Sequence, residues 1–471
     1  MRKLDQSERD DVTYTLAEYI TEVRFEDLPL NVIAAVKGYI LDSLGCTLGG
    51  SRLKPGKIMI DLFGEMGGKP EATLLSTKIR VPCLNAAHVN SSLANLLDFD
   101  DTYSALAHPG ATTIPPALAL GESLRVSGRM FLLAVILGYE VMIRIGMGIT
   151  PSPDRYRKVM GLSVFQIFGA VVVGGKLLGL DTRQMMMAMG FAGASAPVPN
   201  SRKIGLELDD RPFSWIKNNF GWASMGGILA AMLASRGFVG TQRIFEGDRG
   251  FWIMASSDQC NYQKMTEGLG TQYLTLQNSY KPYSACRWVH SSLDATGKLM
   301  KKNSFDPERI TSIRVETFEE IANKFGVVKP ENIIDAQFSL PYLIALELLG
   351  RSSRFGLREE DLEDIRVIEL ANKVTIRENL QATEQYEKDR LMVSTVIVKT
   401  DDGKTFSETV NISRGDPDNA LSQDEILEKF THLATPVVGG RETERLIKAI
   451  DRLESVEDIS ELVPSPPDSN A

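Results

Sequence analysis

The chain has 471 residues, a length typical of two or three domain-sized units. Its composition, 43% hydrophobic and 24% charged, is that of a globular protein and excludes disorder over most of the length. The 52 Lys and Arg residues against 61 Asp and Glu residues give a formal net charge of −9. This acidic balance argues against nucleic acid or an anionic membrane as the partner, because both attract clustered positive charge.

The cysteines and histidines do not have the spacing of a metal site. The four cysteines are far apart, and the four histidines include neither an HExxH motif nor a pair at helical spacing. The N-terminal segment is charged throughout and lacks the apolar stretch of a secretory signal. The longest apolar run, residues 131–149, contains Glu140 and Arg144, which indicates a buried helix rather than a membrane span. We therefore predict a cytoplasmic protein with free thiols and no metal.

Residues up to about 270 follow a helical pattern. Asp181 and Gln184 have the spacing of a capping box, which starts one of these helices. Small residues are common in the apolar faces, and they let helix axes approach closely. Helices are expected over residues 31–47, 86–97, 114–125, 130–149, 162–178, 183–191 and 223–235.

After about residue 275 the pattern changes to mixed helix and strand. Strands are expected at 313–318 and in a hairpin of 391–400 and 405–412, joined by the turn residues DDGK. Helices are expected at 341–349 and in 357–369, whose end takes on strand character; the helical pattern returns from Ser422 to Leu462. We predict a mainly α fold, in which residues 1–275 and 416–463 form an all-helical domain, 276–415 an inserted α+β domain and 464–471 a flexible tail. A crevice between two domains is a favoured place for a small-molecule site.

The segment LANLLDFDDTYSALAHPG carries most of the chemistry. An apolar helix runs into Asp98, Asp100 and Asp101, and then into Thr102 and His108. Acids at a helix C-terminus face the negative end of its dipole, at a cost of roughly 0.3–1 kcal/mol each. If the helix continues, Asp98 and Thr102 share one face. A carboxylate and an imidazole joined by a His-Pro-Gly turn form an acid–base pair, and a solvated acidic loop is the alternative.

Two further segments offer cations. In KPYSACRWVH, Lys281, Cys286 and Arg287 can form an anion-binding wall, or can be surface cations beside a buried cysteine. In SWIKNNFGW, Lys217 lies among aromatic residues, either with its end in solvent or as a partly desolvated cation awaiting a carboxylate. Glycine-rich phosphate loops, a dinucleotide fingerprint and the GxSxG motif are lacking, so phosphoryl transfer, nicotinamide chemistry and serine hydrolysis have no support.

Together these segments resemble the MmgE/PrpD family, which includes 2-methylcitrate dehydratases, cis-aconitate decarboxylases and iminodisuccinate epimerases. The resemblance runs from LDSLGCTLGG near the start to RGDPDNALSQDEILEKF near the end, and LDFDDTY…HPGA, KPYSACRWVH and DAQFSLPY are its most specific parts. It implies a homodimer without cofactor, in which a large helical domain carries a smaller α+β lid. The implied partner is a small di- or tricarboxylate substrate.

The resemblance also implies roles for single residues. The family's catalytic residues fall on Asp98, Thr102, His108, Lys217 and Lys281, and its lid tyrosine on Tyr342. Two positions depart from the decarboxylases: Met160 stands where they carry a histidine, and Cys286 where the mammalian type has a lid histidine. Because a methionine cannot exchange protons, Met160 weakens the decarboxylase assignment.

The shared chemistry is removal of a proton from a carbon next to a carboxylate. We expect Lys217, Lys281 and Arg287 to bind substrate carboxylates, and Asp98 or His108 to move the proton. The remaining candidate substrate contacts are Thr102, Cys286 and Tyr342. Our first expectation is a dehydratase of a citrate-like hydroxy polycarboxylate such as 2-methylcitrate. The alternatives are an epimerase of an amino- or imino-dicarboxylate, a cis-aconitate decarboxylase and a relative without catalysis.

Overall fold

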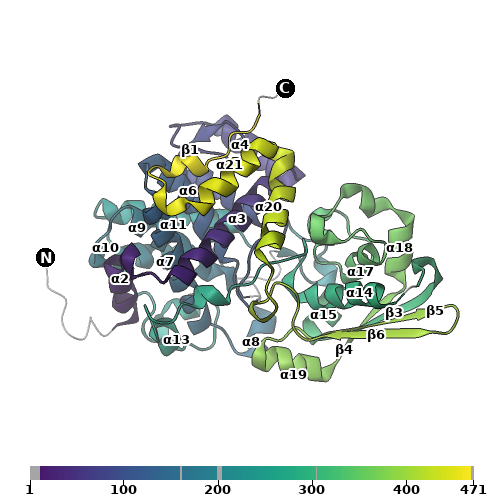
Figure 1. Cartoon of the computed structure of the whole chain (residues 1–471). Coiled ribbons are helices and arrows are strands. Elements are labelled where there is room, and N and C mark those ends of the chain that lie inside the picture. Colours follow the sequence, from purple (N-terminus) through teal and green to yellow (C-terminus); the bar gives the residue numbers. More distant parts are fainter. Residues whose placement is uncertain (1–10, 105, 160–161, 199–203, 304, 468–471) are drawn as a thin grey trace.

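The computed structural model describes residues 11–104, 106–159, 162–198, 204–303 and 305–467 and has a mainly α fold, as the sequence predicts. Helices account for almost all regular structure before residue 280, and they pack into one large body (Figure 1). Their bounds are α2 (Val12–Glu22), α3 (Leu30–Gly50), α4 (Lys54–Met66), α5 (Cys83–Leu96), α6 (Pro109–Leu124), α7 (Gly128–Gly148), α8 (Pro153–Lys158), α9 (Ile167–Leu177), α10 (Thr182–Ala194), α11 (Phe220–Ser235), α12 (Phe251–Met254) and α13 (Tyr262–Thr266). The next helix, α14 (His290–Lys302), lies outside this body, beside the four-stranded sheet described below (Figure 1). The two short strands β1 (Ala72–Thr73) and β2 (Arg80–Val81) pair in antiparallel fashion within this body.

The core of the helical body contains α3 and α7, which are long and apolar enough to cross a membrane. In this fold 78% of the most apolar stretch of α3 and 89% of that of α7 are buried inside the protein. The two buried charges within α7 are paired: Arg144 Nε donates to Glu140 Oε1 at 2.7 Å. Glu140 also accepts hydrogen bonds from the backbone and hydroxyl of Thr275, so this buried pair fixes the segment that leads to Lys281.

The four-stranded sheet lies to one side of the helical body (Figure 1). Its order is β4 (Val374–Glu378), β3 (Ile310–Thr317), β5 (Ser394–Thr400) and β6 (Thr405–Val410), with β3 parallel to β4 and the other pairs antiparallel. The expected hairpin is β5 and β6, whose turn contains Gly403 at φ 81°. The accompanying helices are α15 (Glu319–Lys324), α16 (Ile333–Ala336), α17 (Leu340–Leu348), α18 (Ile365–Asn372) and α19 (Leu380–Asp389).

The C-terminal helices return to the N-terminal part of the chain. Helix α20 (Gln423–Val438) begins at a capping box of Ser422 and Glu425 and packs against α3, and α21 (Gly440–Asp451) follows it (Figure 1). The apolar face of α20 is buried at Phe430 and Leu433. Residues from the two ends of the sequence therefore share one layer.

The structure corrects one predicted element. Residues 357–369 do not end as a strand, because a 3-10 helix at Glu359–Glu363 leads into α18 and the strand β4 starts only at Val374. Other expected helices are present with shifted ends. Helix α6 starts five residues before its predicted position, since Pro109 occupies its first turn, where a missing N–H costs nothing.

Candidate active site

The site is built at the carboxyl end of α5. This helix ends at Leu96, close to its predicted end, so it does not continue far enough for Asp98 and Thr102 to share a helical face. Asp98 has a positive φ of 48°, and its main chain turns away from the helix axis. Such a conformation is unfavourable for a non-glycine residue and persists only where the surroundings hold it.

Five consecutive carbonyl groups at this end of α5, those of residues 95–99, each accept a hydrogen bond from a side chain that lies far away in the sequence. The donors and acceptors are Lys217 to Asn95 O at 2.6 Å, Gln337 to Leu96 O at 2.8 Å, Ser284 to Leu97 O at 2.6 Å, Lys281 to Asp98 O at 3.0 Å and Lys429 to Phe99 O at 2.6 Å. A helix leaves its last carbonyls without internal partners and carries partial negative charge there. Three of the five donors are ammonium groups, so the negative end of α5 is neutralised by cations from three distant parts of the chain.

The Asp98 carboxylate lies between two of these lysines. Its Oδ1 is 3.2 Å from Lys217 Nζ and its Oδ2 is 3.2 Å from Lys281 Nζ, and all three side chains are buried. Burial alone would raise the pKa of Asp98, but the two ammonium groups hold it well below its ordinary value. Asp98 is therefore a permanent anion that orders the lysines, and a poor base.

Lys217 is fully occupied within the protein. Its ammonium group donates to Asn95 O, to Asp98 Oδ1 and, at 3.0 Å, to Gln337 Oε1. Burial lowers its pKa, an effect that Asp98 opposes. Since an ammonium group has three N–H donors, Lys217 has none left for a ligand, and its side chain does not line the cavity described below. Lys281, by contrast, lines the cavity and uses its donors on Asp98 alone among the hydrogen bonds and ion pairs of the described residues.

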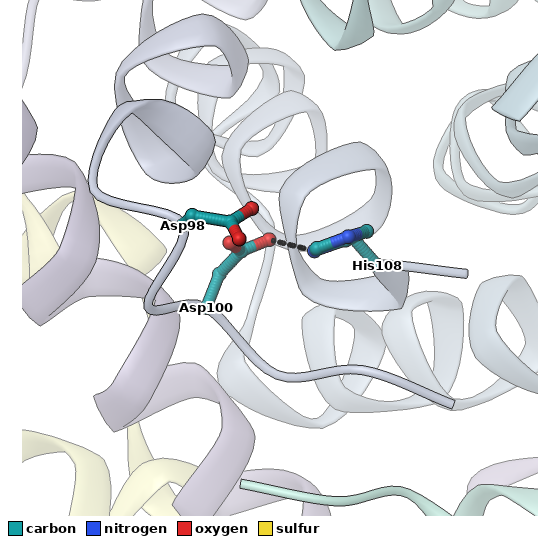
Figure 2. A group of neighbouring side chains, drawn as sticks. All are labelled: Asp98, Asp100 and His108. Atoms are coloured by element: carbon teal, nitrogen blue, oxygen red, sulfur yellow. Dashed lines mark hydrogen bonds and ion pairs between the residues drawn. The ribbon is translucent and has the colours of Figure 1, made fainter. Parts of the chain in front are cut away.

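His108 is paired with Asp100, as Figure 2 shows. His108 Nδ1 lies 3.0 Å from Asp100 Oδ2, and Asp100 Oδ1 accepts a hydrogen bond from Asn95 Nδ2 at 2.9 Å. Burial opposes ionisation of Asp100, yet His108 draws the pKa of this carboxyl below its ordinary value. A carboxylate at Nδ1 places the ring proton there and leaves Nε2 free to accept a proton.

The third acid of the motif has a different environment. Asp101 accepts hydrogen bonds from the Gly110 amide at 3.1 Å, from the Tyr139 hydroxyl at 2.9 Å and from the Asn278 amide. Burial, followed by repulsion from Asp42 and Asp100, raises the pKa of Asp101 to about 8. Asp101 therefore fixes the start of α6, and it is not among the residues that line the cavity described below.

Asp98, Asp100 and His108 also have the geometry of a possible metal site, because one ligand atom from each lies within 4.8 Å of the others (Figure 2). The surroundings oppose this use. Lys217 and Lys281 already contact both oxygens of Asp98 and would repel a cation. Asp98 is therefore engaged as the partner of the two lysines, and the Asp100–His108 pair is better suited to proton transfer than to holding a metal.

A cavity of about 100 Å³ lies over these groups. Its polar end is formed by Asp98, Thr102, His108, Lys281 and Arg287. Thr102 is held in place, since its hydroxyl donates to Ala107 O at 2.8 Å and its backbone pairs with that of Ser279. The cavity thus joins the loop after α5 to the segment that carries Lys281.

Arg287 and Cys286 both line the cavity. Arg287 is buried, with Nη2 3.0 Å from Asp416 Oδ2 and Nη1 donating to Arg414 O at 3.2 Å, and burial lowers its pKa. Burial raises the pKa of the Cys286 thiol to about 12, so this thiol is protonated at neutral pH and is not a nucleophile.

One predicted contact is not brought into the site. Tyr342 is fully buried in the first turn of α17, does not line the cavity, and its hydroxyl has no hydrogen-bond partner among the described residues. The charges that act on it belong to Asp361, Arg358, Arg351 and Asp364, which are not among the residues that line the cavity. Met160 lies outside the described residues.

Sequence reasoning missed Asp100, Gln337 and Lys429. Asp100 stands within the DFDD motif, and its spacing of eight residues from His108 was a signal for the pair. Gln337 is part of DAQFSLPY, whose Tyr342 we expected in the site instead. Lys429 has no local signal, because only the packing of α20 on α3 buries it.

The chain was compared with known proteins. Residues 14–263 match the model of the MmgE/PrpD N-terminal domain, and residues 283–455 match that of the MmgE/PrpD C-terminal domain. Cis-aconitate decarboxylase-like protein oryM of Aspergillus oryzae is 24% identical, over 98% of each chain. A cis-aconitate decarboxylase of Aspergillus terreus is 25% identical, again over 98% of each chain. The cis-aconitate decarboxylase of Homo sapiens is 26% identical, over 97% of this chain and 96% of the relative.

Both halves of the sequence are therefore matched by one family, in the order and over the length that the motifs indicate. The curated relatives cover nearly the whole chain, and decarboxylases are lyases. The chain belongs to the MmgE/PrpD family and is a lyase of that type.

Proposed function

We propose that the protein is a lyase without cofactor that dehydrates a hydroxy polycarboxylate, a class to which 2-methylcitrate belongs. The observation that carries this proposal is the Asp100–His108 pair beside the Lys281 ammonium group in one cavity. A base next to a fixed cation is what removal of a proton beside a carboxylate requires, because the negative charge that develops must be held as it forms.

In the proposed reaction, His108 Nε2 takes the proton from the carbon next to a substrate carboxylate, which Lys281 binds. The electron pair of the broken C–H bond delocalises into that carboxylate, where Lys281 stabilises it. The pair then forms the carbon–carbon double bond as the β-hydroxyl leaves. His108 returns the proton to this hydroxyl, so that one molecule of water is released and the imidazole is neutral again.

The names of the relatives favour a second candidate, decarboxylation. In that case the electron pair comes from loss of CO₂ rather than from a C–H bond, and His108 would protonate the carbon. An epimerase would remove and return the same proton without loss of water or CO₂.

One experiment separates these reactions. The enzyme is incubated in deuterated water with a mixture of hydroxy and unsaturated di- and tricarboxylates, and the pool is followed by NMR. An alkene product at the expense of a hydroxy acid supports the dehydratase, CO₂ loss supports the decarboxylase, and deuterium uptake alone supports the epimerase. His108→Ala and Lys281→Ala should each abolish most turnover. Near-normal rates in both variants would refute the assignment, whichever reaction is seen.

A further inference from the structure

Much of the cavity lining is apolar. Six buried side chains form what we call the apolar wall, namely Ile204, Leu206, Phe213, Trp288, Phe325 and Phe338. Its aromatic rings are in mutual contact: Phe213 and Phe338 stack with centroids 3.8 Å apart, and Phe325 lies 6.0 Å from Phe338 and 5.8 Å from Trp288. None of these six residues offers a charged group to a ligand.

The charges around the cavity balance one another. Three cations and three carboxylates line the cavity or pair with residues that line it. Asp98 pairs with Lys217 and Lys281, Asp416 with Arg287, and Asp100 with His108. The net charge of this group is therefore zero when His108 is neutral. Among the described residues, the lining cations are Lys281 and Arg287. Each of these two lining cations can bind one carboxylate, and the described part of the lining offers no third cation to a third carboxylate.

We propose that the substrate is a hydroxy dicarboxylate that carries an apolar substituent of more than one carbon, with the two carboxylates at Lys281 and Arg287 and the substituent against the apolar wall. The inference rests on the proposed function and narrows its substrate class. Burial of the substituent supplies affinity that a third carboxylate could not, at about fourfold for each methylene removed from water.

Titration calorimetry with three probes, 2-methylmalate, 2-propylmalate and citrate, tests this proposal, and the His108→Ala variant gives the binding heat of any probe that the unaltered protein turns over. We expect 2-propylmalate to bind about 15-fold more tightly than 2-methylmalate, since it buries two further methylenes, and to bind more tightly than citrate. An affinity that is flat along the alkyl series, or citrate as the tightest of the three, would overturn the proposal.

A variant locates the effect at the apolar wall. Ile204→Asn keeps the number of side-chain heavy atoms and replaces apolar atoms by a polar amide. The preference for propyl over methyl should therefore fall to within about threefold, while 2-methylmalate binds as before. Ile253→Asn is the matched control, because Ile253 is an exposed residue of α12 outside the cavity lining, and should keep the preference. Equal loss in both variants would overturn the assignment to the wall. If Ile204→Asn does not fold, the affinities of the alkyl series for the unaltered protein still test the proposed substrate class.

The two proposals fail in different ways. Calorimetry reads the substrate class without turnover, and NMR in deuterated water reads the reaction. An alkyl preference without any turnover of a 2-alkylmalate would leave the binding class standing and reject the dehydratase. Dehydration of citrate with no alkyl preference would support the dehydratase and reject the proposed substrate class.

Discussion

Replacement of Asp100 by Asn tests whether His108 is the base. In the native protein Asp100 Oδ1 accepts from Asn95 Nδ2, while Oδ2 lies against His108 Nδ1. In Asp100→Asn the amide oxygen is expected to stay with Asn95, so that the amide NH₂ points at His108 Nδ1 and donates to it. The imidazole proton is then forced onto Nε2, and His108 can no longer accept a proton from the substrate.

The size of the effect follows from the lost charge. Two unit charges about 4 Å apart interact by about 4 kcal/mol at an effective dielectric constant of about 20. His108 is positively charged only after it has taken the proton, so the loss of about 2–4 kcal/mol affects the transition state and not substrate binding. We expect kcat to fall by about 30- to 1,000-fold.

The assay is turnover followed by NMR, with ligand affinity measured in parallel by calorimetry. Asp248→Asn is the control, because it removes one exposed carboxylate from the surface and should leave kcat unchanged. A kcat for Asp100→Asn within threefold of the unaltered protein, with unchanged thermal stability, would refute the role of the pair.

Three further predictions concern stability and assembly. Protonated Asp101 stabilises the native state fully at pH values below the unfolded-state pKa of about 4, and this contribution is lost as the pH rises toward 8. Relative to Asp101→Asn, the free energy of unfolding of the unaltered protein, measured in urea, should therefore fall by up to about 1.4 kcal/mol per pH unit over this range. Parallel curves of unfolding free energy against pH for the two proteins would contradict this. Lys429→Met leaves Asp42 as a buried unpaired anion and should cost about 3–5 kcal/mol, much of which the double variant with Asp42→Asn should recover, as thermal unfolding can measure. We also propose that the exposed apolar residues Ile58, Trp215 and Trp222 contact a second copy of this chain in a dimer. Trp222→Glu should then be a monomer, as light scattering can measure. An unaltered protein that is already monomeric would reject the proposal.

The sequence predicts the elements better than their contacts. The helix at Leu30–Gly50 and the hairpin of β5 and β6 could be located because their periodicity and turn residues are local signals. The end of α5 was located within one residue, but the conformation that follows it could not be predicted, because only contacts with remote side chains hold Asp98 at its positive φ. Local patterns do not report such contacts.

The site shows the same limit at single residues. The proximity of Asp98, His108 and Lys281 was available from the resemblance and not from their spacing. The role expected of Lys217, binding a substrate carboxylate, differs from its place in the structure, because its three N–H donors are used inside the protein. Lys429 lies in a helix whose charged residues are typical of a solvated face, and nothing in that pattern shows that one lysine is buried.

The contact of Lys429 with the carbonyls of Phe99 and Lys281 has a consequence for biosynthesis. Residues 98 and 108 leave the ribosome early, but the side chain that secures the loop between them emerges more than 300 residues later. A nascent chain that has reached residue 420 already contains every group proposed to contact the substrate, yet it lacks Lys429, whose hydrogen bonds hold that loop. Catalytic competence should therefore appear late and abruptly during translation. Incomplete chains then encounter carboxylates without reacting with them.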